Sequence, residues 1–335
     1  MQICNITTAI DGASGVATFV RELDAAIRAK GVKSIVVEGG RCSGSVDVLH
    51  IHGLWLKMYH RAARWAIENR IPIVWSTHGM TAPWSMHHKW WKKMPAWWLY
   101  QKNDLKKAVA IHCTTEQEVE WNKALGFNNC FIAPLGTWLP SSIPAHNSNN
   151  ILLFVGRIHP VKGLVNLIKA WKILCSTRVN ITWKLRIVGP DQVGHQSVLE
   201  ALVRELGLGD SVEFPGPKFG EELSAEYDNC DCLILPSFTE NFGATIVDAM
   251  AHAKPCIAST FTPWHVLVEK KCGWWVSNEP EKLAGGIVEM INCGDKKRQE
   301  MGQNGLRLVK EKYTWDAVAD TMIAKYKEVL GCKWI

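Results

Sequence analysis

Two carboxylates frame a short turn in the second half of the chain. Glu240 precedes Asn241, Phe242 and Gly243, and Asp248 follows inside a predicted helix that begins at Ala244. The apolar run before the turn is typical of a short buried strand. Backbone N–H groups at a helix start bind anions, and carboxylates accept hydrogen bonds from hydroxyls. The stretch suits a phosphate-bearing, hydroxyl-rich ligand, and a plain helix entry with solvated acids is the alternative on these residues alone.

The elements that must position these residues form two α/β halves. Strand-like runs alternate with amphipathic helices before residue 134 and again after residue 151. Such alternation predicts parallel sheets with helices on both faces. Polar residues rich in Pro, Ser and Asn at 141–150 predict a linker. We therefore expect an N-terminal domain at 1–140, a C-terminal domain at 151–312 and a final helix in 313–335.

Three candidate ligand-binding features of the first half lie on or after predicted strands. Gly15 closes a glycine loop before a helix, but the loop lacks the G-x-G-x-x-G spacing of a dinucleotide site. His78 stands at the carboxyl end of a strand, where α/β proteins bind ligands. His50 and His52 share one strand face, and with no third ligand in view we favour a role other than metal binding.

Residues 84–107 interleave aromatic and basic side chains. Trp90, Trp91, Lys92 and Lys93 lie at the centre of this segment, whose only acid is Asp104. Indole rings and lysines together favour an interface with anionic lipid headgroups. Nucleic acid and a folded core with a solvated lysine face are the other interpretations.

Composition excludes several classes of protein. The charged fraction of 21% and the apolar fraction of 47% are those of a folded globular chain. The net charge of +6 is too small by itself to indicate nucleic acid as a partner. Eleven scattered cysteines without a Cys-x-x-Cys favour reduced thiols in the cytoplasm. No signal peptide or membrane-spanning run is predicted.

Several motifs of the second half resemble those of the retaining glycosyltransferases of family 4. The matching residues are Val155-Gly156-Arg157 with Lys162-Gly163, Val188-Gly189-Pro190, Val212 to Gly216, Leu235-Pro236-Ser237, and Glu240 to Met250. The N-terminal half matches more loosely, at Gly15 and around His78. The resemblance implies the GT-B fold: two facing Rossmann-like domains with parallel sheets, and a C-terminal helix that crosses back to the first domain.

The resemblance also implies roles for individual residues. Arg157 and Lys162 would clamp the diphosphate, Glu240 would bind the donor sugar hydroxyls, and His78 would contact that sugar from the other domain. The backbone at Asn241, Phe242, Gly243 and Ala244 would meet sugar and phosphate, Gly15 and Gly156 would allow close approach to the phosphates, and Gly189, Pro215 and Gly216 would surround the base. The family has a second glutamate where this chain has Asp248, which puts its contact with the donor ribose in doubt.

The function that follows is transfer of a hexose-type sugar from a UDP- or GDP-linked donor to a saccharide acceptor. The resemblance to a bacterial polysaccharide subgroup implies a lipid-linked acceptor and a cytoplasmic protein that is peripheral on the inner face of the plasma membrane. We expect no cofactor, no metal and no nucleic acid. The alternatives are another GT-B enzyme, such as a nucleotide-sugar epimerase, and a non-catalytic homologue that binds glycan or lipid.

Overall fold

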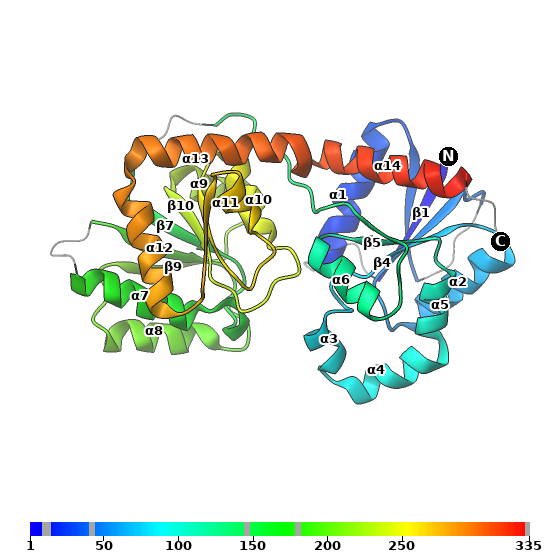
Figure 1. The fold of residues 1–335 in the computed structure, drawn as a ribbon, viewed down its shortest axis with the longest axis horizontal. Helices are drawn as coiled ribbons and strands as arrows, with labels where there is room; N and C mark the ends of the chain where they lie inside the picture. The colour runs from blue at the N-terminus through cyan, green and yellow to red at the C-terminus, as the bar shows by residue number, and fades with distance from the viewer. Residues whose placement is uncertain (9–14, 40–43, 144–147, 178–181, 332–335) are drawn as a thin grey trace. The chain divides into compact units, whose positions relative to one another are not determined.

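The computed structural model describes residues 1–8, 15–39, 44–143, 148–177 and 182–331. The chain divides into two compact units (Figure 1). Unit 1 contains Met1–Gly136 and Tyr313–Ile335, and unit 2 contains Thr137–Lys312. Residues 11–14 of the expected glycine loop and residues 144–147 of the expected linker lie outside the described part of the chain.

The sheet of unit 1 has the strand order β2-β1-β3-β4-β5-β6, and every pairing is parallel. Its strands are β1 (Gln2–Thr7), β2 (Lys33–Glu38), β3 (Val48–His52), β4 (Ile73–Ser76), β5 (Ala110–Cys113) and β6 (Cys130–Ile132). Parallel strands require crossover connections, and helices supply them on both faces. The helices of unit 1 are α1 (Gly15–Ala29), α2 (Lys57–Glu68), α3 (Pro83–His87), α4 (Trp90–Ala96), the π-helix η1 (Trp97–Gln101), α5 (Lys102–Lys107), α6 (Glu116–Ala124) and α14 (Trp315–Gly331).

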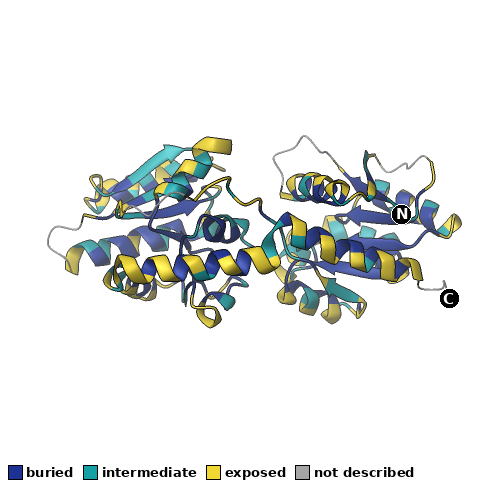
Figure 2. Ribbon diagram, turned by 90° about the horizontal axis from the view of Figure 1, so that it is seen from above, coloured by how far each residue is buried: buried dark blue, intermediate teal, exposed yellow. Residues whose placement is uncertain are grey.

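The last helix of the chain belongs to unit 1, although it follows unit 2 in the sequence. Helix α14 packs beside α1 on one face of the sheet, and its Trp315, Met322 and Tyr326 are buried. Figure 2 shows buried residues in the strands and exposed ones along the outer sides of the helices. A Cβ added at Gly136 would lie 2.5 Å from the Trp315 ring, so the chain leaves β6 in close contact with this helix. The other face is covered by α2 and α5, which pack on Leu49, Ile51 and Trp75.

Unit 2 repeats the architecture with the strand order β12-β11-β10-β7-β8-β9, again parallel throughout. Its strands are β7 (Ile151–Val155), β8 (Lys184–Val188), β9 (Val212–Gly216), β10 (Cys232–Leu235), β11 (Cys256–Ser259) and β12 (Gly273–Val276). Its helices are η2 (Pro160–Lys162), α7 (Leu164–Thr177), α8 (His195–Glu205), α9 (Gly220–Asn229), α10 (Ala244–Ala251), α11 (Val266–Glu269), α12 (Pro280–Asn292), α13 (Gly294–Leu308) and the π-helix η3 (Val309–Tyr313). The two parallel six-stranded sheets agree with the predicted α/β architecture of two domains.

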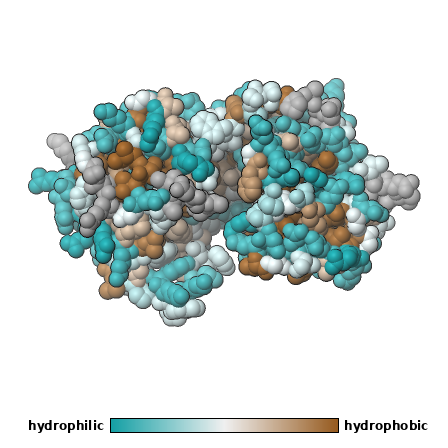
Figure 3. Space-filling model, turned by 180° about the vertical axis from the view of Figure 1, so that it is seen from behind, coloured by the Kyte–Doolittle hydropathy of each residue, from teal (hydrophilic) through white to brown (hydrophobic). Residues whose placement is uncertain are grey.

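The surface mixes both kinds of side chain, with hydrophobic ones scattered among hydrophilic ones on the face that Figure 3 shows. None of the helices within the described ranges is long and apolar enough to cross a membrane. Eight described cysteines, two in unit 1 and six in unit 2, are free thiols, which agrees with the prediction of reduced thiols rather than a disulfide framework. Cys4 in β1 departs from that prediction because it is disulfide-bonded, and spacing along the chain does not show which sulfurs the fold brings together.

Candidate functional site

The residues singled out in unit 2 gather at one edge of its sheet. Strand β7 lies between β10 and β8. The strands that follow β7 are therefore added first on its β8 side, as β8 and β9, and then on its other side, as β10, β11 and β12. At such a reversal the loops at the carboxyl ends of neighbouring strands diverge and leave room for a ligand. The loops that follow β7, β8 and β10 carry Gly156, Gly189 and Glu240 respectively, and Gly216 is the last residue of β9.

Glu240 and Lys162 form an ion pair at this edge. The Lys162 ammonium donates to Oε1 of Glu240, and the Ser237 hydroxyl donates to the same oxygen at 2.7 Å. The two side chains of the pair retain only 13% and 12% of their exposure, so water screens the pair weakly. The structure thus joins the residue expected to bind phosphate with the residue expected to bind sugar hydroxyls.

Lys162 is held there by a tight contact between two loops. It ends η2, which Pro160 begins and the His159 side chain caps by accepting from the Val161 N–H. Gly163 follows with φ of 69°, and a Cβ at this position would lie 2.1 Å from the carbonyl oxygen of Pro236. Any side chain at Gly163 would therefore push the Lys162 loop away from the loop that carries Glu240.

Arg157 lies on the opposite side of β7 from that pair. Its guanidinium is exposed and donates through Nη1 to Oε1 of Gln192, in the loop after β8, at 2.8 Å. The backbones of the two loops are also close, because a Cβ at Gly189 would lie 1.9 Å from the Gly156 carbonyl oxygen. In this structure Arg157 therefore contacts the β8 loop, and Lys162 contacts the β10 loop.

The turn after Glu240 is arranged to start a helix. Gly243 has φ of 85°, and a Cβ there would lie 2.8 Å from a methyl carbon of Leu235. Phe242 is buried, its ring packs edge-on against Trp264 at 5.3 Å, and its carbonyl accepts from the Trp264 indole N–H. Helix α10 then begins at Ala244, and Asn241 is partly buried beside it.

Asp248 has a partner within unit 2. Its Oδ1 accepts a hydrogen bond from the Thr137 hydroxyl at 2.7 Å. Burial raises the pKa of the Asp248 carboxyl, while the Thr137 hydroxyl and His252 act in the opposite direction. This contact ties α10 to the first residue of unit 2, a structural use of the acid that the motif comparison did not predict.

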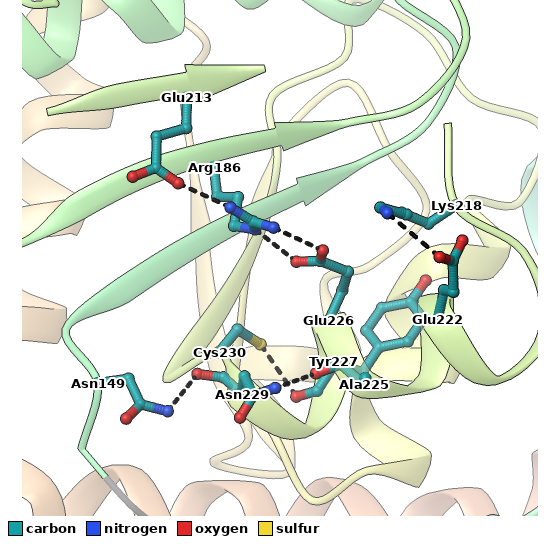
Figure 4. Close-up of polar contacts among 10 residues, drawn as sticks. All are labelled: Asn149, Arg186, Glu213, Lys218, Glu222, Ala225, Glu226, Tyr227, Asn229 and Cys230. Carbon is teal, nitrogen blue, oxygen red and sulfur yellow. Dashed lines mark hydrogen bonds and ion pairs between the residues drawn. The ribbon is translucent and has the colours of Figure 1, made fainter. Parts of the chain in front are cut away.

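Strand β9 brings Pro215 and Gly216 to the same edge, where the Gly189 N–H donates to the Gly216 carbonyl at 3.1 Å. An ion-pair network fixes this strand to helix α9 (Figure 4). Arg186 on β8 contacts Glu226 of α9 through two bonds of 2.6 and 2.8 Å, and Glu213 of β9 at 2.7 Å. The two glutamates raise the pKa of the Arg186 guanidinium, with Glu226 contributing more.

In unit 1, His78 follows β4 with φ of 48°, and its Nε2 lies 3.2 Å from Nδ1 of His52. Burial lowers the pKa of His78 to about 3, with a smaller contribution from His112. The His78 ring is therefore neutral at physiological pH. Gly15 begins α1, and a Cβ at this position would meet no heavy atom of the described residues within 4 Å.

A chain of buried side chains runs beside His78 that the sequence analysis did not find. His50 contacts the Tyr326 hydroxyl and the Ser76 hydroxyl, each at 2.7 Å. Ser76 contacts Nδ1 of His112 at 2.6 Å, and Nε2 of His112 lies 2.7 Å from the Ala133 carbonyl oxygen. In the sequence, only the alternation of His50 and His52 along β3 points to this buried chain. The hydrogen-bond partners of His50 and the other members of the chain come from β4, β5 and α14.

Both ring nitrogens of His50 and of His112 are thus used in hydrogen bonds within the protein. Among the residues that the structure describes, no group of three or more His, Cys, Asp or Glu side chains is placed to hold a metal ion.

The tryptophan–lysine segment belongs to unit 1. Trp90, Trp91 and Lys92 of α4 are exposed. Lys93 is partly buried, and its ammonium donates to the Ser85 carbonyl. Burial lowers the pKa of Lys93, and neighbouring Lys89 lowers it further.

Comparison with known proteins places this geometry in a class. Sucrose-phosphate synthase from Thermosynechococcus elongatus superimposes with a TM-score of 0.75 at 19% identity, over 99% of this chain and 100% of that one. Anabaena HepE in complex with UDP and glucose superimposes with a TM-score of 0.74 at 17% identity, over 98% and 99% of the two chains. The protein therefore has the GT-B fold of these structures.

Sequence comparison identifies the family. Glycosyl transferases group 1 matches residues 140–308, and the glycosyl transferase 4-like domain matches residues 42–136. The chain belongs to the glycosyl transferases group 1 family. An uncharacterized glycosyltransferase of Methanocaldococcus jannaschii is 32% identical over 196 residues, which are 57% of this chain and 48% of that protein. The chain spans about half the length of the curated relatives it matches.

Proposed function

We propose that this protein is a retaining glycosyltransferase of family 4. It moves a hexose-type sugar from a nucleoside-diphosphate donor to a hydroxyl of a lipid-linked saccharide in the synthesis of a cell-surface polysaccharide. Family membership supports glycosyl transfer, and the presence of UDP and glucose in the structural neighbour HepE supports a nucleotide-sugar donor. We place the protein in the cytoplasm, peripheral on the inner face of the plasma membrane.

The observation that carries the proposal is the Lys162–Glu240 pair at the reversal point of the unit 2 sheet. A nucleotide sugar has a diphosphate joined to a ring of hydroxyls. The pair offers the Lys162 ammonium to the diphosphate and the Glu240 carboxylate to the hydroxyls, and these two groups are in contact with each other. On donor binding, Lys162 turns from the carboxylate to the diphosphate, and Glu240 accepts from sugar hydroxyls instead.

The chemistry in this proposal needs stabilisation of charge rather than a protein nucleophile. The bond from the anomeric carbon to the phosphate oxygen breaks, and a bond to the acceptor oxygen forms on the same face. The departing phosphate oxygen takes the proton of the acceptor hydroxyl. Arg157, Lys162 and the backbone N–H groups from Gly243 onward stabilise the negative charge of the diphosphate as it leaves. Metal independence is part of this proposal.

Unit 1 contributes His78 and the acceptor side. A neutral imidazole with a lowered pKa accepts a hydrogen bond from a sugar hydroxyl without introducing a positive charge beside the reacting carbon. Gly15, at the open start of α1, leaves the backbone accessible to the donor phosphates.

Two substitutions at the ion pair should have different effects on the affinity for nucleoside diphosphate in the absence of sugar. Lys162→Met removes the cation and should weaken binding of nucleoside diphosphate about tenfold or more, as expected for loss of a charge-assisted hydrogen bond. Glu240→Gln releases Lys162 from its carboxylate, so nucleoside diphosphate should bind as tightly as before or more tightly. Both variants should lose sugar transfer.

The measurement is thermal shift with UDP, GDP, TDP and ADP, followed by donor-dependent release of nucleoside diphosphate. A ligand that binds only the folded state raises the unfolding temperature. The control is Lys310→Gln, which removes one positive charge from an exposed lysine of unit 2. Full turnover in Lys162→Met or Glu240→Gln would refute the proposed site, and binding without any turnover in the wild type would favour the non-catalytic alternative.

A further inference from the structure

Residues 84–107 form an excursion from the sheet of unit 1 with two different faces. Helices α3 and α4 extend away from the sheet (Figure 1). The inner face is anchored: Trp97 is buried and packs edge-on against Phe127 at 6.1 Å, and the Gln101 side chain accepts from the Trp55 N–H at 2.8 Å. The interpretation of these tryptophans as core residues therefore holds for Trp97.

The outer face exposes large apolar side chains in a stripe. Trp91, Trp98 and Leu99 are 58%, 69% and 77% exposed. They lie seven and eight positions apart along the run of α4 and η1, the spacing of residues on one helical face. Trp84 and Trp90 are also exposed on the same excursion. Single exposed apolar residues are ordinary, but several on one short segment mark an interaction surface.

The charges beside this stripe have one sign at the surface. Lys89 and Lys92 are exposed, and the Lys102 ammonium lies 5.4 Å from the centre of the Trp98 ring. The only carboxylate of the segment, Asp104, is buried and contacts Nδ1 of His60 at 2.8 Å. A negatively charged partner thus meets lysines and no opposing exposed acid within this segment.

We propose that the exposed apolar and basic side chains of this excursion, Trp84, Lys89, Trp90, Trp91, Lys92, Trp98, Leu99 and Lys102, dock on an anionic lipid bilayer; we call them the Trp–Lys surface. Indole rings settle at the boundary between headgroups and acyl chains, and lysines beside them contact anionic headgroups. Lys93 is excluded because its ammonium is held on the inner side by the Ser85 carbonyl and lies 5.7 Å from the centre of the Trp55 ring.

This inference rests on the proposed function and deepens it. A lipid-linked acceptor stays in the bilayer, so a transferase that uses one must meet the membrane with its acceptor-side unit. The run from α4 to α5 buries Trp97, Gln101 and Leu105 and exposes Trp91, Trp98 and Leu99, so it also presents apolar side chains to solvent. Exposed apolar side chains with lysines beside them suit a segment that lies in the interface of a membrane.

The test is flotation of the full chain with vesicles. We compare vesicles of phosphatidylcholine alone with vesicles that contain about one third phosphatidylglycerol. The wild type should float with the anionic vesicles only. Lys89→Gln with Lys92→Gln should weaken partitioning about thirtyfold, since each lysine near an anionic surface contributes roughly a fivefold factor. Lys310→Gln with Lys312→Gln in unit 2 removes the same charge from two exposed lysines and should leave partitioning unchanged.

A second pair of variants separates the aromatic contribution from charge. Trp91→Ser with Trp98→Ser should weaken binding at both low and high salt, whereas the lysine pair should matter less as salt rises. Nucleoside-diphosphate thermal shift on every variant reports whether unit 2 is intact.

Each outcome bears on a single claim. Equal flotation of the two lysine pairs, or no flotation of the wild type with anionic vesicles, would overturn the docking surface while leaving donor turnover as a separate question. Flotation without donor-dependent release of nucleoside diphosphate would instead remove the proposed function and leave the surface in place. Binding of short RNA in preference to anionic vesicles would replace the bilayer by nucleic acid as the partner.

Discussion

His78 Nε2 lies 3.2 Å from His52 Nδ1, and this contact fixes which nitrogen of His78 carries the proton. The amide of Asn5 donates to the Ser34 hydroxyl at 3.0 Å, so its oxygen faces Nε2 of His52 at 3.1 Å and accepts from it. The neutral His52 ring can then only accept at Nδ1, and His78 must donate from Nε2. Nδ1 of His78 keeps its lone pair, and in the proposed function it is the atom that accepts a hydrogen bond from a sugar hydroxyl.

Asn5 is therefore a positioning residue, and its substitution should impair transfer without touching nucleotide binding. Asn5→Leu removes the acceptor that orients His52, so His78 loses its fixed tautomer. We expect transfer to fall about five- to thirtyfold, the equivalent of one hydrogen bond of roughly 1–2 kcal/mol. The measurement is kcat/KM with the sugar donor, beside thermal shift with nucleoside diphosphate alone, which should stay at the wild-type value.

The matched control for Asn5 is Ser34→Ala. That change removes the other partner of the Asn5 side chain but leaves the amide oxygen in front of His52. Transfer should stay close to wild type in Ser34→Ala. If the two variants lose activity equally, the Asn5 effect comes from disruption of the sheet edge rather than from the His78 tautomer.

The donors and acceptors are also fixed in the other buried chain, which contains His50, Ser76 and His112. The Ala133 carbonyl can only accept, so His112 donates from Nε2 and accepts from the Ser76 hydroxyl at Nδ1. His50 must then donate to Ser76 and accept from the Tyr326 hydroxyl. Every member is satisfied only while both histidines are neutral. The chain links α14 to three strands of unit 1 through groups that cannot accept an extra proton.

Unit 1 should consequently lose stability in mild acid. Burial lowers the pKa of His50, His52, His78 and His112, that of His78 to about 3. Below the pKa of the unfolded histidine, near 6.5, the unfolded chain binds more protons than the folded chain. The free energy of unfolding therefore falls as pH is lowered, by about 1.4 kcal/mol per pH unit for each histidine.

For four such histidines the loss between pH 7 and pH 5.5 is at most about 5 kcal/mol, reached when all four rings stay neutral in the folded state. Urea unfolding followed by tryptophan fluorescence at each pH measures it. A His50→Asn variant should show about three quarters of the pH dependence. His87→Ala, which changes an exposed histidine on α3, should show all of it. A flat stability profile from pH 7 to pH 5.5 would mean that these rings accept protons in the folded state.

The sequence predicts the fold well because its cues are local. Periodicity and glycine-bearing loops locate the strands around Val155, Val188 and Leu235, and parallel pairing brings their carboxyl ends to one edge. The motif residues Lys162 and Glu240, although far apart in sequence, follow adjacent strands β7 and β10, so their meeting was foreseeable from the topology.

Side-chain partners beyond the motifs were not foreseeable in this way. Tyr326 reaches His50 across 276 positions, and only the packing of α14 on unit 1 makes that contact. Thr137 stands at the start of unit 2 and has no motif to mark it, yet its hydroxyl contacts Asp248. Such contacts depend on where helices settle on a sheet, which spacing along the chain does not specify.

Asp248 is the position where the chain departs from the family pattern, and its contact with Thr137 predicts a structural effect. Thr137→Val should lower the free energy of unfolding of unit 2 by about 1–3 kcal/mol, because a buried carboxylate loses a donor. Thr137→Ser keeps the hydroxyl and should behave as wild type. The hydrogen bond favours the charged carboxylate, whose pKa burial raises, so the loss should shrink as pH falls through that raised pKa. Urea unfolding at pH 8 and pH 5 measures the difference. An equal loss at both values would show that Thr137 acts through packing and leave Asp248 without a structural role.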